Sequence, residues 1–468
     1  MFTASRIRLL VVACSALFMA MLDNLVLGVA LPSIQRSFEA GMSDLEWFMN
    51  AYTLAFSVLL IPFSALGERF GRKRMFLIGV GVFTLGSALA GLSASSIELI
   101  LARALQGVGG AAIVPLSLTL VNGAFPAENR AAALGIWSGI SGLGLSIGPL
   151  VGGLIVEGAP WQLIFWVNVP VGALALLFGA RWLTESRGER KPLDPIGIAL
   201  LAAGLFGLVF GLEQGNEAGW LSAKVLALLF GGAVLLLLFY AWERGRSQPF
   251  VQFGLFRRRT YSTYVFVGFW MNAGIFGAIF LLTLFLQQAQ GYSALEAGVR
   301  TMAWTGCTML AAPLAGMAIA RFGTRTVFAL GLSLQAVALA GFALLISLAG
   351  SDFPFGFQAP LMMAAGTGMG LSFTPLAHGV LASVPDADAG EASGIGNATR
   401  ELGGVFGIAI AGLVFRSGPA IQSPADFGSN VVPALLSGSA MIAFALFALL
   451  LFARPRRERF EELLPIRH

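Results

Sequence analysis

Long apolar stretches separated by short polar ones run along the whole chain. Each apolar stretch is close to the roughly 20 residues that an α-helix needs to cross the hydrocarbon core of a membrane. No stretch alternates as a transmembrane β-strand would, and backbone polar groups in lipid must be satisfied within the segment, so helices are expected. The pattern predicts spans at residues 7–31, 45–66, 74–94, 97–122, 131–156, 161–183, 195–213, 221–242, 262–288, 296–319, 326–348, 356–380, 391–415 and 432–453.

Composition supports an all-α polytopic membrane protein with 14 transmembrane helices. Hydrophobic residues make up 57% of the 468 residues and charged residues 11%, whereas a soluble domain has about 25% charged residues. Most Lys and Arg residues fall in the two ends and in alternate loops, and four lie on the other side: Arg36, Lys224, Arg300 and Arg416. The positive-inside rule then predicts that both termini are cytoplasmic. The basic pI therefore reflects membrane topology, and no nucleic-acid binding is expected.

The chain contains an internal repeat. Residues 320–331, ARFGTRTVFALG, align with residues 68–79, ERFGRKRMFLIG, at a spacing of 252 residues. The same spacing places Gly152 on Gly404 in another pair of spans. Two halves in the same direction are the parallel repeat of many secondary transporters. Because the seventh and eighth spans have no counterpart, the predicted parts are a six-helix bundle at 1–186, an inserted helix pair with linkers at 187–250, and a second six-helix bundle at 251–468.

Charged residues inside the spans are candidates for function. Asp23 in the first span and Arg103 in the fourth fall at similar depth in the outer half of the membrane, and a carboxylate there costs about 2.5–3.5 kcal/mol on insertion scales. We interpret Asp23 as a proton carrier and Arg103 as the charge that tunes it; the alternative is a static structural pair. Arg400 and Glu401 lie in the thirteenth span. Glu401 is either a second protonation site or only the neighbour of Arg400.

Two segments are candidates for conformational gating. The loop GERFGRKR combines turn-forming glycines with basic side chains that can bind helix ends and anionic lipid, and its candidate residues are Gly67, Glu68, Arg69, Gly71, Arg72 and Arg74. In the fifth span, Gly144, Gly148 and Gly152 recur every four residues, which permits close helix packing. Pro149 removes one backbone hydrogen bond from the same helix.

Aromatic and amide side chains within the spans are candidates to line a cavity for large apolar substrates, although each of them could instead face lipid. These residues are Asn24, Asn50, Tyr52, Trp137, Trp270, Asn272, Phe280, Trp304 and Asn397. Cys14 and Cys307 lie in apolar spans without a metal-site spacing. No phosphate-binding loop or catalytic motif occurs. We therefore expect neither metal nor cofactor, and an ion gradient as the source of energy.

Several of these segments resemble one family. GERFGRKR, LARALQGVGGAA at 101–112 and SIGPLVGG at 146–153 resemble motifs of the major facilitator superfamily. LDNLVLGVALP near the start and GEASGIGNATRELGG at 390–404 are similar to its fourteen-helix drug:proton antiporter branch. The family usually has Asp where Glu68 stands, and other residues where Leu25 and Gly28 stand.

The resemblance implies a proton-coupled multidrug-type efflux antiporter that works by alternating access and confers antibiotic resistance. Its expected partners are protons, the lipid bilayer and small lipophilic substrates. Asp23 is the one well-placed carboxylate, so these substrates are expected to be neutral or monocationic. The expected location is the bacterial cytoplasmic (inner) membrane, as a monomer. The alternatives are a proton-coupled uptake symporter for a small solute and, in another class, an integral membrane enzyme or receptor.

Overall fold

The computed structural model describes residues 3–187, 194–246, 249, 251–385 and 388–453, and this part of the chain is helical without strands. Within it, 13 helices are long and apolar enough to cross a membrane. A further helix of 28 residues, α13, is also long enough to cross. The chain is thus a multi-pass membrane protein, and the fourteen predicted spans correspond to these helices.

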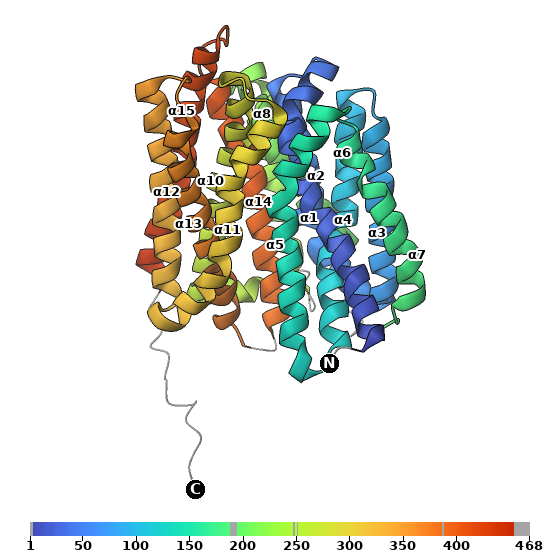
Figure 1. The fold of residues 1–468 in the computed structure, drawn as a ribbon. Helices are drawn as coiled ribbons and strands as arrows, with labels where there is room; N and C mark the ends of the chain where they lie inside the picture. The colour runs from blue at the N-terminus through green and yellow to red at the C-terminus, as the bar shows by residue number, and fades with distance from the viewer. Residues whose placement is uncertain (1–2, 188–193, 247–248, 250, 386–387, 454–468) are drawn as a thin grey trace.

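The first group of helices forms the right-hand side of the molecule in Figure 1. The sixth predicted span begins with a short helical segment of four residues, α6, which is followed by α7. The first group consists of α1 (Ala4–Phe38), α2 (Met42–Phe70), α3 (Arg72–Leu92), α4 (Ser96–Ala124), α5 (Ala127–Gly158), α6 (Leu163–Trp166) and α7 (Asn168–Trp182).

The second group forms the left-hand side in Figure 1. It consists of a 3-10 turn η1 (Phe253–Arg257), α10 (Arg259–Leu284), a π-helical turn η2 (Phe285–Ala289), α11 (Ala294–Phe322), α12 (Thr324–Ala349), α13 (Phe355–Ala382), α14 (Ala389–Arg416) and α15 (Pro424–Phe452). Between the two groups in the chain lie α8 (Pro195–Ala218) and α9 (Ala223–Arg244), which pack on each other. Helix α8 also contacts α2 and α14, so it covers one side of the seam between the groups.

The two groups repeat the same helix packing, but the spacing between them is not constant. Helices α2 and α11 both have 29 residues and begin 252 residues apart, as the sequence predicts. In the fifth helix, Gly148 lies against the Leu22 carbonyl of α1, whereas Gly407 of α14 lies against the Ala273 carbonyl of α10. The predicted spacing would have matched Gly148 with Arg400 instead. The match of the fifth-span glycines at 252 residues is therefore wrong, because α12 is 26 residues long and its counterpart α3 only 21.

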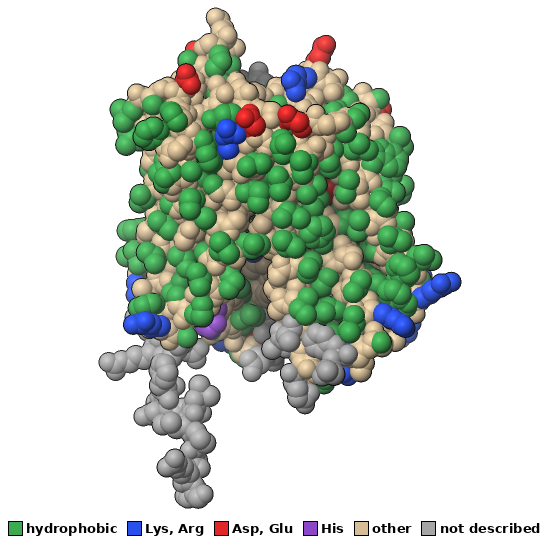
Figure 2. Space-filling view, in the orientation of Figure 1, with side chains coloured by type: hydrophobic (Ala, Val, Ile, Leu, Met, Phe, Trp, Pro, Cys, Tyr) green, Lys and Arg blue, Asp and Glu red, His purple; other side chains and the backbone are tan. Residues whose placement is uncertain are grey.

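The seam between the groups is closed at one end and open at the other. A Cβ added to Gly153 of α5 would lie 2.7 Å from the Ala294 carbonyl oxygen of α11, so the backbones meet there. Nearer the start of α5, a Cβ added to Gly135 or Gly139 would meet no atom within 4 Å. Figure 2 shows the corresponding hollow between the groups, at the end of the molecule where α1 begins. The structure is therefore open toward the side of the N-terminus.

Candidate functional site

Asp23 lies at the centre of a buried polar cluster formed by four helices of the first group. Its carboxylate accepts hydrogen bonds from Arg103 Nη1 in an ion pair, from Gln106 Nε2 at 3.2 Å and from Asn168 Nδ2 at 2.9 Å. Ser87 Oγ accepts hydrogen bonds from Gln106 Nε2 at 2.7 Å and from Asn168 Nδ2 at 2.9 Å. Asp23 is 2% exposed. The two residues predicted to share a depth are thus in direct contact, and Asp23 faces no open cavity in this conformation.

Further contacts of Arg103 hold its guanidinium in place beside Asp23. Nε donates to the Phe48 carbonyl oxygen at 3.1 Å, and Nη1 donates to Gln106 Oε1 at 2.9 Å. The guanidinium carbon lies 4.6 Å from the ring centroid of Tyr52 and 5.9 Å from that of Phe165. A buried charge is tolerated only when it is paired and hydrogen-bonded. The ion pair and its hydrogen bonds therefore hold α1 against α4.

Sequence reasoning missed three members of this cluster: Ser87, Gln106 and Asn168. Each is an uncharged polar residue inside an apolar span, and each is at most 1% exposed. Buried polar groups in lipid require hydrogen-bond partners. A search for amide side chains in spans at the depth of Asp23 would have identified Gln106 and Asn168 as candidates.

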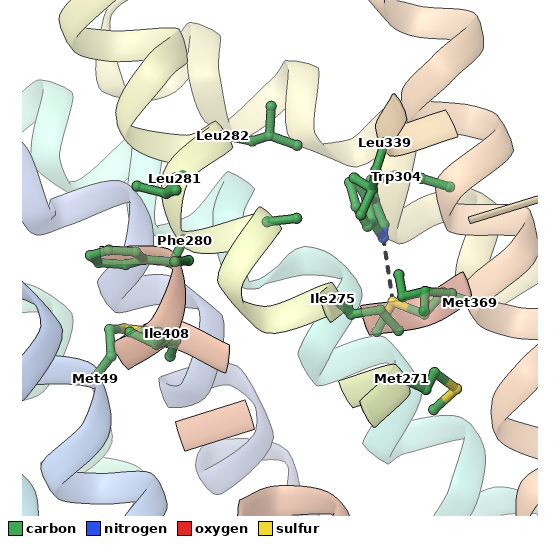
Figure 3. Close-up of a cluster of buried hydrophobic side chains, with 14 of the residues drawn as sticks. Met49, Met271, Ile275, Phe280, Leu281, Leu282, Trp304, Leu339, Met369 and Ile408 are labelled. Atoms are coloured by element: carbon green, nitrogen blue, oxygen red, sulfur yellow. Dashed lines mark hydrogen bonds between the residues drawn. The ribbon is translucent and has the colours of Figure 1, made fainter. Parts of the chain in front are cut away.

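The second group keeps the packing of this region but not its chemistry. Gly107 of α4 fits against the Tyr52 carbonyl, and Gly366 of α13 fits in the same way against the Trp304 carbonyl. Arg103, four residues before Gly107, thus corresponds to a buried methionine, Met362. Trp304 Nε1 donates to the Met369 sulfur at 3.3 Å within an apolar cluster (Figure 3). At this position the second group therefore has an apolar side chain where the first group has the partner of Asp23.

Arg400 and Glu401 contact each other on α14. Arg400 Nη2 lies 2.6 Å from Glu401 Oε1, and the two side chains are 28% and 12% exposed. The Arg400 guanidinium also lies over the Phe373 ring at 5.3 Å, and its carbonyl oxygen accepts a hydrogen bond from Asn272 Nδ2 at 2.8 Å. Neither residue contacts Asp23 among the bonds of the described residues. The pair is more accessible than the Asp23 cluster, and its part in proton coupling stays a prediction.

The basic loop is organised by two acidic residues. Arg72 pairs with Glu68 one helical turn earlier, with Nε at 2.9 Å from Oε1 and Nη2 at 2.7 Å from Oε2. Gly71 has φ 116°, a conformation that favours glycine. Glu185, in the segment after α7, accepts hydrogen bonds from the Lys73 and Arg74 backbone N–H groups at 3.0 and 3.1 Å. This carboxylate satisfies free N–H groups at the start of α3.

The remaining basic residues of this loop make weaker contacts. Arg69 lies 5.4 Å from the ring of its neighbour Phe70, and a Cβ on Gly67 would overlap the Leu116 side chain of α4. The loop thus joins α2, α3, α4 and the segment after α7 at the open end of the seam. Its role in gating remains a prediction.

The glycine stripe of α5 packs on α1, the helix that bears Asp23. A Cβ on Gly144 would lie 3.0 Å from the Met21 Cβ, and one on Gly148 would lie 3.2 Å from the Leu22 carbonyl oxygen. Gly152 continues the same contact one turn later. Pro149 follows on the buried side and lines a small pocket between the two groups. The stripe therefore holds α5 in close contact with the Asp23 segment of α1.

An enclosed apolar pocket lies between the two groups, near the closed end of the seam. Its volume is about 30 Å³, and it is lined mainly by aliphatic and aromatic side chains, including Leu25, Met49, Phe280, Trp304 and Met362. Gly28 of α1 faces Thr283 of α10 across it. Two of the predicted substrate-facing residues, Phe280 and Trp304, are thus brought together at this pocket.

The other predicted substrate-facing residues lie apart. Asn50 and Tyr52 are buried in the first group; Trp137 donates through Nε1 to Ser117 Oγ at 3.0 Å. Trp270 packs against Phe444, which is 47% exposed.

Two further predicted residues occur near α14. Asn272 is 1% exposed and holds the Arg400 carbonyl, whereas Asn397 is exposed on α14 itself. The side chain of Asn24 lies outside the described part of the structure.

Comparison with known proteins gives consistent results. A family model described as the Major Facilitator Superfamily matches residues 13–408. The multidrug resistance protein Stp of Mycobacterium tuberculosis (strain CDC 1551 / Oshkosh) is 35% identical over 407 residues, which are 86% of this chain and 74% of that protein. The cephamycin export protein CmcT of Amycolatopsis lactamdurans is 35% identical over 452 residues, 96% of this chain and 91% of that protein.

A solved structure shows the same fold. The bacterial homolog of the human lysosomal transporter Spinster, in an inward-facing and unoccupied conformation, superposes with a TM-score of 0.69 at 16% sequence identity. The superposition covers 97% of this chain and 98% of that chain.

Proposed function

The chain belongs to the Major Facilitator Superfamily, a family of membrane transporters, and from this premise we propose that it is a proton-coupled exporter of lipophilic compounds. Relatives that match most of the chain are named as multidrug resistance and antibiotic export proteins. The observation that carries the proton-coupled part of the proposal is the buried cluster in which Asp23 is held by Arg103, Gln106 and Asn168.

The cluster links the protonation of Asp23 to helix packing. An ionised carboxylate only accepts hydrogen bonds, whereas a protonated one also carries an O–H donor. When Asp23 takes up a proton, the ion pair with Arg103 of α4 is lost, and one oxygen no longer serves as an acceptor for the amides of Gln106 and Asn168. The contacts among α1, α4 and α7 must then rearrange. Since α5 packs on the same segment of α1, proton binding and movement of the seam are coupled.

The direction of the cycle follows from burial and topology. We assign the open end of the seam to the cytoplasm, because the basic loops lie there and the positive-inside rule applies. In this inward-open conformation Asp23 is 2% exposed and paired with Arg103. The structure then corresponds to the state after proton release, ready to receive substrate from the cytoplasm or the inner leaflet. Proton uptake occurs after the outer side has opened.

The proposed substrate class follows from the apolar pocket and from the charges available. The pocket between the groups, about 30 Å³ in this conformation, is lined by apolar and aromatic side chains. These side chains would suit a lipophilic molecule once movement of the groups widens the pocket. We assign the protein to the drug:proton antiporter branch with fourteen spans, as a monomer in the bacterial cytoplasmic membrane. We also propose that residues 1–186 and 251–468 are the moving bundles and that 187–250 carry an inserted helix pair.

Transport into inverted membrane vesicles under opposite pH gradients tests the direction of coupling. Inverted vesicles made from cells that express the protein should accumulate a lipophilic fluorescent dye when their lumen is acidified, and the accumulation should collapse when an ionophore abolishes the pH gradient. The same vesicles with an alkaline lumen should not accumulate the dye. Accumulation driven by an alkaline lumen and not by an acidic one would identify a proton symporter and refute export by antiport.

A further inference from the structure

A buried ion pair joins the two groups of helices at the closed end of the seam. Arg416 Nη1, at the end of α14, contacts Glu46 Oε1, near the start of α2. The Glu46 side chain is 0% exposed and the Arg416 side chain 13% exposed. Within the described part of the chain, this is the one ion pair that connects α1–α7 with α10–α15. Neither the motifs nor the polar cluster around Asp23 involves it.

The residues around this pair leave space for it and cover it. Gly412 lies one turn before Arg416 on α14, and a Cβ at this position would overlap the Glu46 carboxylate. Trp47, the next residue on α2, packs against Phe206 and Phe210 of α8 with ring centroids 5.5 and 5.9 Å apart. The inserted helix α8 therefore covers the seam beside the pair and keeps it from lipid.

The position of the pair ties it to the closed state. At the same end of the seam, Ser146 and Thr305 exchange hydrogen bonds at 3.2 and 3.0 Å, and Gln288 Nε2 donates to Gln35 at 2.6 Å. Opening of this end must separate α2 from α14 and break the pair. Glu46 and Arg416 would then face the outer medium.

We propose that Glu46 is a proton-sensitive residue of the outer gate. Its ionised carboxylate holds Arg416 and keeps the outer end closed, and a proton taken up from the external medium abolishes the ion pair and favours the outward-open state. Proton binding to Glu46 and closure of the gate exclude each other, so external acidity and gate opening are thermodynamically linked. The proposal rests on the proposed function for the assignment of the closed end to the outside.

Other charged groups near this end whose side chains are described have partners of their own. On α2, Asp44 accepts a hydrogen bond from the Gly41 N–H at 3.0 Å. On α9, Lys224 Nζ donates to Gln214 at 2.5 Å; on α15, Asp426 is bound by Ser423 at 2.8 Å. On α10, Arg259 lies at the opposite end of the helix. Helix α8 carries Glu213 and Glu217 near this end, and both are therefore included as controls.

Cysteine labelling from outside the cell tests the proposal without any substrate. In a background with Cys14→Ala and Cys307→Ala, Thr305→Cys reports opening of the outer seam to a membrane-impermeant maleimide. Leu221→Cys, in the turn between α8 and α9 where the side chain is 88% exposed, corrects for the effect of pH on the reagent. The corrected rate at Thr305→Cys should rise as external pH falls.

Glu46→Gln and, independently, Arg416→Gln should raise the corrected labelling rate roughly tenfold at neutral pH, since each removes one partner of a buried pair. In an Asp23→Asn background, which removes the proton site of the polar cluster, Glu46→Gln should also abolish the pH dependence. The matched controls Glu39→Gln, Glu213→Gln and Glu217→Gln should label slowly and keep that dependence.

Three results would overturn the proposal. These are unchanged labelling in both variants of the pair, an equal rise in a control variant, or a pH dependence that survives Glu46→Gln in the Asp23→Asn background. Labelling of Leu221→Cys only in inverted vesicles would instead contradict the orientation assumed in the proposed function.

Discussion

Three side chains donate hydrogen bonds to Asp23, so a proton on its carboxyl group must disturb some of these contacts. Arg103, Gln106 and Asn168 come from two helices other than α1. Truncation of one donor leaves the carboxylate buried with fewer partners, which changes the balance between its ionised and protonated forms. The cluster should therefore respond to single substitutions by a change in coupling rather than by a loss of the fold.

Arg103→Ala should impair coupled transport at least tenfold and change its pH dependence, because it removes the charge that pairs with Asp23. Asn168→Ala should have a smaller effect in the same assay, since it removes one neutral hydrogen bond of about 1 kcal/mol. Dye efflux from cells at several external pH values measures both. Arg187→Ala, at an exposed position after α7, is a control. A pH profile of Arg103→Ala identical to that of the unmodified protein would contradict the coupling role.

Sequence reasoning found the charges of the site but not its neutral members. Asp23 and Arg103 could be identified because a charge inside an apolar span is costly. Ser87 and Asn168 are uncharged and so cost less in lipid, and the hydrogen bond between them becomes visible only when α3 and α7 are seen beside α1. The pairing of Glu46 with Arg416 could not be predicted from the sequence either, since the two residues are 370 positions apart.

Among single helices, α5 and α1 pack so closely that a larger side chain between them would obstruct their relative movement. Gly148→Leu should reduce efflux at least tenfold, because the larger side chain collides with the Leu22 carbonyl and the Leu25 Cβ, both 3.2 Å from an added Cβ. Gly231→Leu on α9, where an added Cβ meets no atom within 4 Å, is the control. Equal efflux in both variants, at equal amounts of protein in the membrane, would show that this contact is dispensable.

The start of α8 provides a second prediction at this scale, concerning pH. Burial alone would raise the pKa of Asp194, but a hydrogen bond shared with Glu243, hydrogen bonds from the Gly197 N–H and Trp242, and the Arg246 charge lower this pKa below its usual range. A group whose pKa is lower in the folded state stabilises the protein above its unfolded pKa, and this contribution is lost as pH falls through the folded value.

Asp194→Asn should therefore lower the Tm of the purified protein at neutral pH, and the difference should shrink below about pH 4, the ordinary pKa of aspartate. Thermal unfolding followed by intrinsic fluorescence measures it. The exposed Asp352→Asn is the control. A difference that grows as pH falls would contradict the lowered pKa.

Helix positions were predictable to within several residues, while the register of the repeat was not. Apolar runs define the spans because lipid excludes unpaired backbone groups. They do not define the helix ends outside the hydrocarbon, so α1 continues to Phe38 and α15 begins at Pro424, beyond the predicted limits. The longer α12 shifts every later match between the two groups.

For the molecule as a whole, the charge of the substrate determines how much of the proton gradient is useful. Expulsion of a monovalent cation against 100 mV costs about 2.3 kcal/mol, and one incoming proton returns the same amount. Neutral and monocationic dyes should therefore be exported with Asp23 alone, and dications poorly. Efflux of matched monocationic and dicationic dyes tests this in the protein and in Glu401→Gln. Efficient export of dications by Glu401→Gln would contradict a single coupling carboxylate.

If a proton on Asp23 drives export, protons and substrate must cross the membrane in opposite directions. Simultaneous measurement of the two fluxes in proteoliposomes tests this. A dye trapped in the lumen reports pH, and a second, lipophilic dye reports transport under an imposed pH gradient. The protein should move substrate and protons in opposite directions. Asp23→Asn keeps the size of the side chain but cannot carry a proton, so it should lose the linked movement while remaining folded. Exchange of substrate for protons by Asp23→Asn at the rate of the unmodified protein would refute proton coupling through Asp23.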